Sequence, residues 1–99
     1  MFDHTGEIVR AVCGRDKGKL LCVVGMNQES PSLSLADGKR RKIAKPKRKK
    51  LGDVEILTDH QHIYDHPVIH SLRRGEPVSD RALRRALAAF KEGTTLGER

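Results

Sequence analysis

The stretch that most constrains the fold is residues 8–24, IVRAVCGRDKGKLLCVV, in which two apolar runs flank a charged segment. Each run is short, rich in β-branched residues and bounded by glycine, which favours strands over helices. Gly14 and Gly18 can adopt positive φ angles, and the side chain of Asp16 can close a local turn. We therefore expect a β-hairpin with a tip at residues 14–19. Its basic residues are Arg15, Lys17 and Lys19.

A second hairpin is predicted after the first. Residues 32–35, SLSL, alternate polar and apolar side chains, as a half-buried strand does. Asp37 and Gly38 follow at once, and this dipeptide is a strong signal for a two-residue turn. We therefore expect the partner strand at residues 39–43.

The next segment is expected to complete a five-stranded sheet. Pro46 should end the fourth strand, because proline cannot donate a backbone hydrogen bond. Residues 47–50, KRKK, would then be an extended, solvated connector. Val54 and Ile56 alternate with acidic residues and can supply the fifth strand.

The pattern becomes helical in the C-terminal part. Residues 67–74 can form a short helix, with a proline in its first turn and Gly75 just past its end. A longer helix is expected at residues 79–92, because Ser79 is a good N-cap and Gly93 a suitable C-cap. Its apolar face consists of Leu83, Leu87 and Phe90.

Positive charge is concentrated in residues 39–50, which hold nine of the chain's twenty basic residues and no acid. The other eleven basic residues face thirteen acids, so the net charge of +7 is a local property of this tract. A concentrated charge of this kind indicates a polyanionic partner, although such a run can also be a solvated surface or a nuclear-localisation signal.

About half of the chain resembles the KOW motif, which occurs in ribosomal proteins and in transcription elongation factors. The matching residues are 6–9, the tip 14–19, residues 23–24, residues 36–38, and residues 41–43 with the basic run that ends at Lys50. The whole is similar to small KOW-domain RNA-binding proteins related to a basic large-subunit ribosomal protein. The resemblance implies a mainly β fold, namely an SH3-like β-barrel of about five strands at residues 1–57. Residues 58–99 would form a short helical appendage and tail.

The resemblance and the charge together predict RNA binding, with ribosomal RNA of the large subunit as the expected partner, in translation or ribosome assembly. The glycines of the tip would permit close approach, and the basic residues would contact phosphates. The predicted RNA-binding residues are Gly14, Arg15, Lys17, Gly18, Lys19, Lys39, Arg40, Arg41, Lys42, Lys45, Lys47, Arg48, Lys49 and Lys50. The alternative is a protein-interaction module of the transcription-elongation kind.

The three aromatic residues, Phe2, Tyr64 and Phe90, all lie outside the tip and the basic tract. Proteins that recognise single-stranded bases normally stack them on aromatic side chains. Their placement therefore favours a folded RNA, contacted through phosphates and 2′-hydroxyls. The helix at 79–92 is interpreted as a packing element, with a helix-turn-helix reader that uses Arg81, Arg84 and Arg85 as the alternative.

Catalysis, cofactors and metals are not expected. The tip is not the P-loop of a nucleoside-triphosphate hydrolase, because Gly14 and Gly18 are separated by three residues instead of four. His62, His66 and His70 are four residues apart, but Pro67 interrupts the helix that would align them. With His60 they are interpreted as loop histidines.

The expected compartment is the cytoplasm. No apolar run is long enough to cross a membrane or resembles a signal peptide. Cys13 and Cys22 lack the spacing of a metal or redox motif and are expected to be reduced thiols. We expect no membrane partner and no small-molecule substrate.

Overall fold

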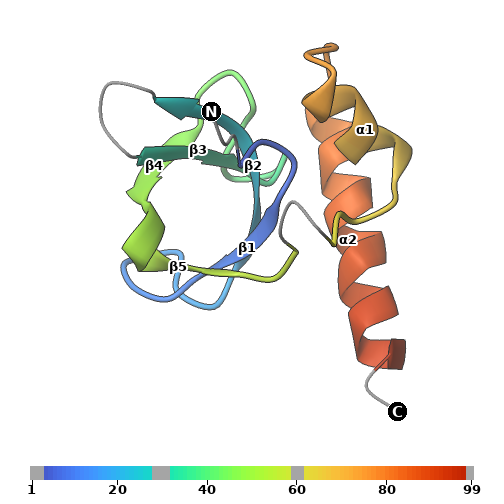
Figure 1. Cartoon of the computed structure of the whole chain (residues 1–99). Coiled ribbons are helices and arrows are strands. Elements are labelled where there is room, and N and C mark those ends of the chain that lie inside the picture. Colours follow the sequence, from blue (N-terminus) through green and yellow to red (C-terminus); the bar gives the residue numbers. More distant parts are fainter. Residues whose placement is uncertain (1–3, 28–31, 59–61, 98–99) are drawn as a thin grey trace.

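The fold is mainly β, with a helical C-terminal part (Figure 1). The structure is a computed structural model that describes residues 4–27, 32–58 and 62–97, with only the backbone described at residue 27 and at residues 93–97. The elements within these ranges are β1 (Ile8–Ala11), β2 (Leu20–Asn27), β3 (Ser32–Ala36), β4 (Lys47–Lys50), the 3-10 helix η1 (Leu51–Asp53), β5 (Val54–Ile56), α1 (Pro67–Arg73) and α2 (Asp80–Gly97).

The five strands form one antiparallel sheet in the order β4-β3-β2-β1-β5. The predicted first hairpin is confirmed, with Ile8 of β1 opposite Cys22 of β2. The sheet curls so that η1 connects its two edge strands, β4 and β5 (Figure 1). No backbone pairing joins these two edges in the described residues, and the sheet is therefore not closed into a barrel.

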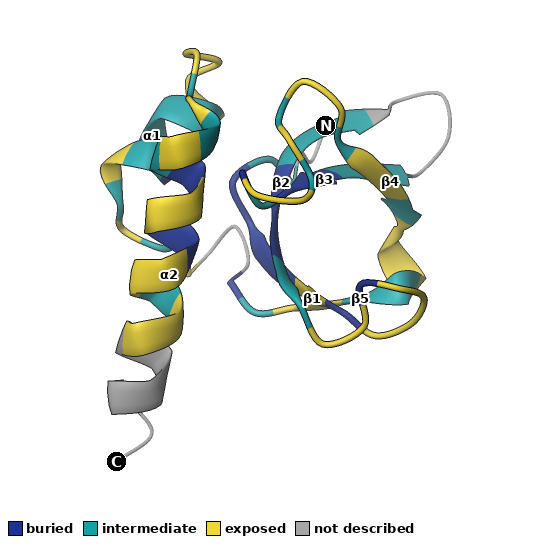
Figure 2. Cartoon of the chain, turned by 180° about the vertical axis from the view of Figure 1, so that it is seen from behind, coloured by how far each residue is buried: buried dark blue, intermediate teal, exposed yellow. Residues whose placement is uncertain are grey.

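Both faces of the curled sheet are apolar. Successive side chains of a strand point to opposite faces, so Ile8 and Val9 belong to different hydrophobic cores. The inner face carries Val9, Ala11, Leu21, Val23, Leu33 and Leu35. The outer face packs Ile8, Cys22 and Ala36 against Ile69 of α1 and against Leu83 and Leu87 of α2. The helices thus share a core with the sheet, and Figure 2 shows the buried side of α2 turned toward β1 and β2.

Both helices begin where the sequence predicts. Pro67 opens α1, and the ring nitrogen Nδ1 of His66 accepts the backbone N–H of Val68 as an N-cap. In α2, the hydroxyl of Ser79 accepts the N–H of Ala82 at 3.1 Å. The predicted end of α2 at Gly93 is wrong, because the helix continues to Gly97. In the described ranges no helix is long and apolar enough to cross a membrane.

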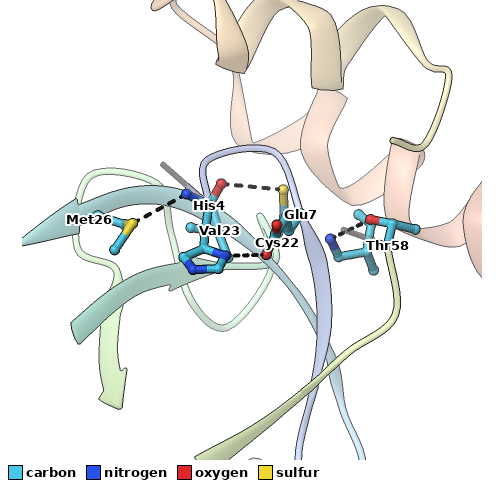
Figure 3. Close-up of polar contacts among 7 residues, drawn as sticks. His4, Glu7, Cys22, Val23, Met26 and Thr58 are labelled. Carbon is cyan, nitrogen blue, oxygen red and sulfur yellow. Dashed lines mark hydrogen bonds and ion pairs between the residues drawn. The ribbon is translucent and has the colours of Figure 1, made fainter. Parts of the chain in front are cut away.

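Polar contacts fix the chain at the start of β1 (Figure 3). The His4 ring nitrogen Nδ1 lies 2.7 Å from Oε1 of the buried Glu7, and the hydroxyl of Thr58 accepts the N–H of Ile8 at 2.9 Å. The other carboxylate oxygen of Glu7 is buried and has no hydrogen-bond partner among the described residues. The hydrogen bond between Ile8 and Thr58 holds the start of β1 to the segment that follows β5.

Two predictions are wrong, namely the strand at residues 39–43 and the solvated connector at residues 47–50. Residues 37–46 form a loop, in which Asp37 Oδ1 accepts the N–H groups of Lys39 at 2.8 Å and Arg41 at 2.9 Å. Residues 47–50 form β4 instead and pair with β3. A strand of four basic residues is stable there because it lies at the edge of the sheet, where charged side chains are well tolerated.

Candidate nucleic-acid interface

The tip of the first hairpin has the backbone that the sequence predicts. Gly14 and Gly18 have φ angles of 80° and 85°, in the region that favours glycine. The N–H of Gly18 donates to the carbonyl of Ala11 at 2.7 Å and closes the loop. A side chain at Gly18 would meet nothing within 4 Å, so this backbone is open to a ligand. Of the predicted tip cations, Arg15 and Lys17 are exposed and Lys19 is half-buried.

Asp16 joins the tip to the basic tract. Its side chain is only 5% exposed, and its Oδ2 accepts from Arg41 Nε at 3.2 Å and from Arg41 Nη2 at 3.0 Å. Two hydrogen bonds from one guanidinium fix both distance and orientation. The ion pair therefore places residues 37–46 next to residues 14–19. Arg41, a predicted RNA ligand, is 30% exposed and makes this structural contact.

Lys49 of β4 makes a second link to the tip. Its Nζ donates to the carbonyl oxygen of Cys13 at 2.9 Å and lies 3.1 Å from the position that a side chain at Gly14 would take. Lys49 is half-buried. The tip thus contacts the basic tract at two places, in the loop 37–46 and in β4.

The four basic residues of β4 lie on two faces of the sheet. Residues that are directly opposite in an antiparallel pair share a face. Lys47 and Lys49 are opposite Leu35 and Leu33, on the inner face. The other two are opposite serines on the outer face, in the pairs Ser34–Arg48 and Ser32–Lys50. Arg48 and Lys50 are exposed and form the outward-facing part of the tract.

The loop 37–46 is held firmly against α2. Gly38 has a φ of 78°, and a side chain there would clash with the backbone carbonyl oxygen of Asp80. The carboxylate of Asp80 accepts the N–H of Ile43 at 2.7 Å. The remaining cations of the loop are exposed on this fixed backbone, namely Lys39, Arg40, Lys42 and Lys45.

A groove between the sheet and α2 adds residues that sequence reasoning missed. It measures about 460 Å³ and lies between the end of the tip, the loop 37–46 and the middle of α2. Arg10 of β1 and Lys91 of α2 line it beside Lys19, Lys39 and Arg40. No local signal connects Arg10 with Lys91, because only the packing of α2 on the sheet brings them together.

The aromatic residues and the histidines considered in the sequence make contacts within the fold. The rings of Tyr64 and Phe90 pack edge to face with centroids 5.1 Å apart, while Phe2 lies outside the described residues. His70 Nε2 lies 2.8 Å from Asp65 Oδ1, and His60 also falls outside the described residues. Within the described ranges, no three histidine, cysteine or acidic side chains gather as metal ligands would.

The candidate interface therefore consists of three adjoining parts: the tip, the loop 37–46 with β4, and the groove beside α2. It joins exposed cations to open glycine backbone, an arrangement suited to phosphate groups. Comparison of the chain with models of known protein families and with curated proteins gives no match to either.

Proposed function

We propose that this protein is a non-catalytic, cytoplasmic RNA-binding protein that contacts ribosomal RNA of the large subunit, in translation or ribosome assembly. The observation that carries the proposal is the Asp16–Arg41 ion pair, which unites the two basic clusters in one surface. Clustered cations on a fixed scaffold neutralise several phosphates together, and this is the main source of affinity for nucleic acid.

The curled five-stranded sheet is compatible with the SH3-like barrel that the KOW resemblance implies. The residues of that resemblance include the tip and the basic tract, which adjoin each other here. The KOW resemblance and the positive charge therefore support RNA binding at the same residues. The curled sheet and the resemblance together are the reason for which we propose an SH3-like barrel.

A folded RNA is the proposed ligand. Tyr64 and Phe90 pack against each other and against the outer core, and neither of them lines the groove or belongs to the tip or the basic tract. The surface presents lysine, arginine and backbone amides, which bind phosphates and ribose. Recognition would then depend on the shape of the RNA more than on its base sequence.

Crosslinking in cells tests this proposal with two charge-matched variants of the full chain. The first replaces Arg15, Lys17 and Lys42 by glutamine, and the second replaces Arg81, Arg84 and Arg85 by glutamine. All six side chains are exposed, and each variant loses three positive charges. We expect ultraviolet crosslinks of the wild type to concentrate in large-subunit ribosomal RNA, to be lost in the first variant and to persist in the second.

Two outcomes would overturn the proposed site. Loss of crosslinks in the second variant alone would move the site to α2 and favour the helix-turn-helix alternative. Crosslinks that persist in both variants would show that neither cluster binds RNA.

The protein-docking alternative has one observation in its favour. Three large apolar side chains are exposed near the edge strand β5: Val12 at 44%, Leu51 at 42% and Ile56 at 37%. Scattered apolar side chains of this kind are common on protein surfaces. A protein partner bound there would dissociate little as salt rises, whereas an RNA bound to the cations would dissociate steeply.

A further inference from the structure

The groove beside α2 is bounded by basic side chains from four separate segments. Its cationic residues are Arg10, Lys19, Lys39, Arg40 and Lys91. One acid, Asp37, also lines it, but the Oδ1 of this carboxylate already accepts two backbone N–H groups. Arg10 faces Glu55 at 3.5 Å, a distance at which two exposed side chains attract each other weakly. The rim of the groove is therefore positive.

The remaining lining of the groove is mostly apolar. Leu20 of β2 with Leu87 and Ala88 of α2 contribute to it, and Gly18 adds open backbone. A volume of about 460 Å³ falls in the range of roughly 300–1,000 Å³ that is typical of sites for small organic groups. A nucleotide has this size, whereas an RNA duplex is far too wide to enter.

The walls of the groove are fixed before any ligand arrives. Gly38 packs against the carbonyl of Asp80, and the Asp80 carboxylate binds the N–H of Ile43. The Asp16–Arg41 ion pair holds the loop to the tip. A preformed site loses less conformational entropy on binding than a mobile one.

From these observations we infer that the groove receives an unpaired nucleotide of the folded RNA, at a bulge or an internal loop. Its phosphates lie against the basic rim, and its ribose and base lie on Leu20, Leu87 and Ala88. This inference rests on the proposed RNA-binding function and adds a preference for a bulged duplex over a fully paired one. It also makes α2 part of the binding surface.

Ala88 and Ala89 provide a matched pair of substitutions for the test. Both side chains are exposed on α2, but Ala88 lines the groove and its neighbour does not. Ala88→Glu and Ala89→Glu therefore change the net charge and the helix propensity equally.

The experiment measures the affinity of the full chain for two blunt RNA duplexes, one fully paired and one with a bulge in one strand. The wild type should bind the bulged duplex about tenfold more tightly, a difference of about 1.4 kcal/mol. Ala88→Glu should remove this preference, because its carboxylate repels the phosphate. Ala89→Glu should retain it. Thermal melting of each variant confirms that the helix is intact.

The outcomes separate this inference from the proposed function. Equal binding of both duplexes by the wild type overturns the inference and leaves RNA binding in place. Equal loss of preference in Ala88→Glu and Ala89→Glu also overturns it. Absence of salt-sensitive binding to either duplex overturns the proposed function itself.

Discussion

Arg41 donates two hydrogen bonds to the carboxylate of Asp16, from Nε at 3.2 Å and from Nη2 at 3.0 Å, across 25 positions of the sequence. This contact joins two segments whose charges would otherwise stand apart. Without it, the tip 14–19 and the loop 37–46 would each offer a few cations to different parts of a ligand. The ion pair makes them one surface.

Replacing Asp16 by asparagine should destabilise the protein by about 1–3 kcal/mol, because the ion pair with Arg41 is replaced by weaker hydrogen bonds to an uncharged amide. Urea unfolding at neutral pH measures the change. Asp65→Asn is the control, since Asp65 pairs with His70 but its side chain is 96% exposed. It should change the stability by less than about 0.5 kcal/mol. Equal effects of the two substitutions would contradict the structural role of Asp16.

Gly38 and Gly18 offer a comparison between two kinds of glycine. Both have positive φ angles, but a side chain would meet backbone atoms of Asp80 at Gly38 and nothing within 4 Å at Gly18. Gly18→Ala should cost about 1 kcal/mol, from backbone strain alone. Gly38→Ala should cost roughly 3 kcal/mol or more, because overpacking adds to the strain. Thermal unfolding distinguishes the two, and similar melting temperatures would contradict the packing of α2 on this loop.

Leu87 tests whether the helical part and the sheet share one core. It is 6% exposed, and Leu87→Ala should lower the free energy of unfolding by about 2–4 kcal/mol. Leu51→Ala is the control, since Leu51 is 42% exposed and should cost well under about 1 kcal/mol. Unfolding should remain a single transition for sheet and helices. Two separate transitions in the wild type would show that α2 is an independent unit.

The elements with local signals were predictable from the sequence. The hairpin 8–24 follows from two β-branched runs and two glycines that do adopt positive φ. The helix starts at Pro67 and Ser79 follow from proline placement and serine capping, and both chemistries act within one turn. Such features need no knowledge of the rest of the fold.

The predictions that were wrong concern segments whose structure depends on residues far away in the sequence. Asp37 and Gly38 carry the signal of a tight hairpin, but the Asp37 carboxylate binds the N–H groups of Lys39 and Arg41 and closes a longer loop. The N–H of Ile43 then goes to Asp80, 37 positions away, and not to a strand partner. Residues 47–50 become a strand because β3 offers a free edge, a property of the sheet that four basic residues do not reveal.

In the candidate site, too, the features with local signals were predictable and those that depend on tertiary contacts were not. The exposed cations of the tip and the loop were named from charge alone, and their common surface comes from Asp16, which was expected to close a local turn instead. Lys49 was grouped with solvated residues but is half-buried against the carbonyl of Cys13. Arg10 and Lys91 joined the site only through the tertiary packing of α2.

The two cysteines should differ sharply in reactivity. Cys13 is exposed and Cys22 is buried, and both are free thiols. Burial raises the pKa of Cys22 from 9.0 to about 12. At pH 9 a thiol reagent should therefore label Cys13 rapidly and Cys22 only when the protein unfolds.

The same shift predicts a loss of stability in alkali. The unfolded Cys22 thiol loses its proton near pH 9, while the folded thiol keeps it until about pH 12. The folded state then binds more protons than the unfolded state, so this contribution to stability is complete below pH 9 and falls between pH 9 and 12. Cys22→Ala should show a shallower decline over this window in urea titrations. An identical decline would contradict the assignment to Cys22.

If the joined tip and basic tract bind RNA through its phosphates, the affinity should fall steeply as the salt concentration rises. The affinity of the full chain for a structured RNA should be measured over a range of monovalent salt concentrations. If five or six phosphates are neutralised, the slope of log K against log salt should be about −4 to −5. A slope between zero and about −1 would mean that binding releases almost no counterions, and phosphate contacts would then not be the source of the affinity.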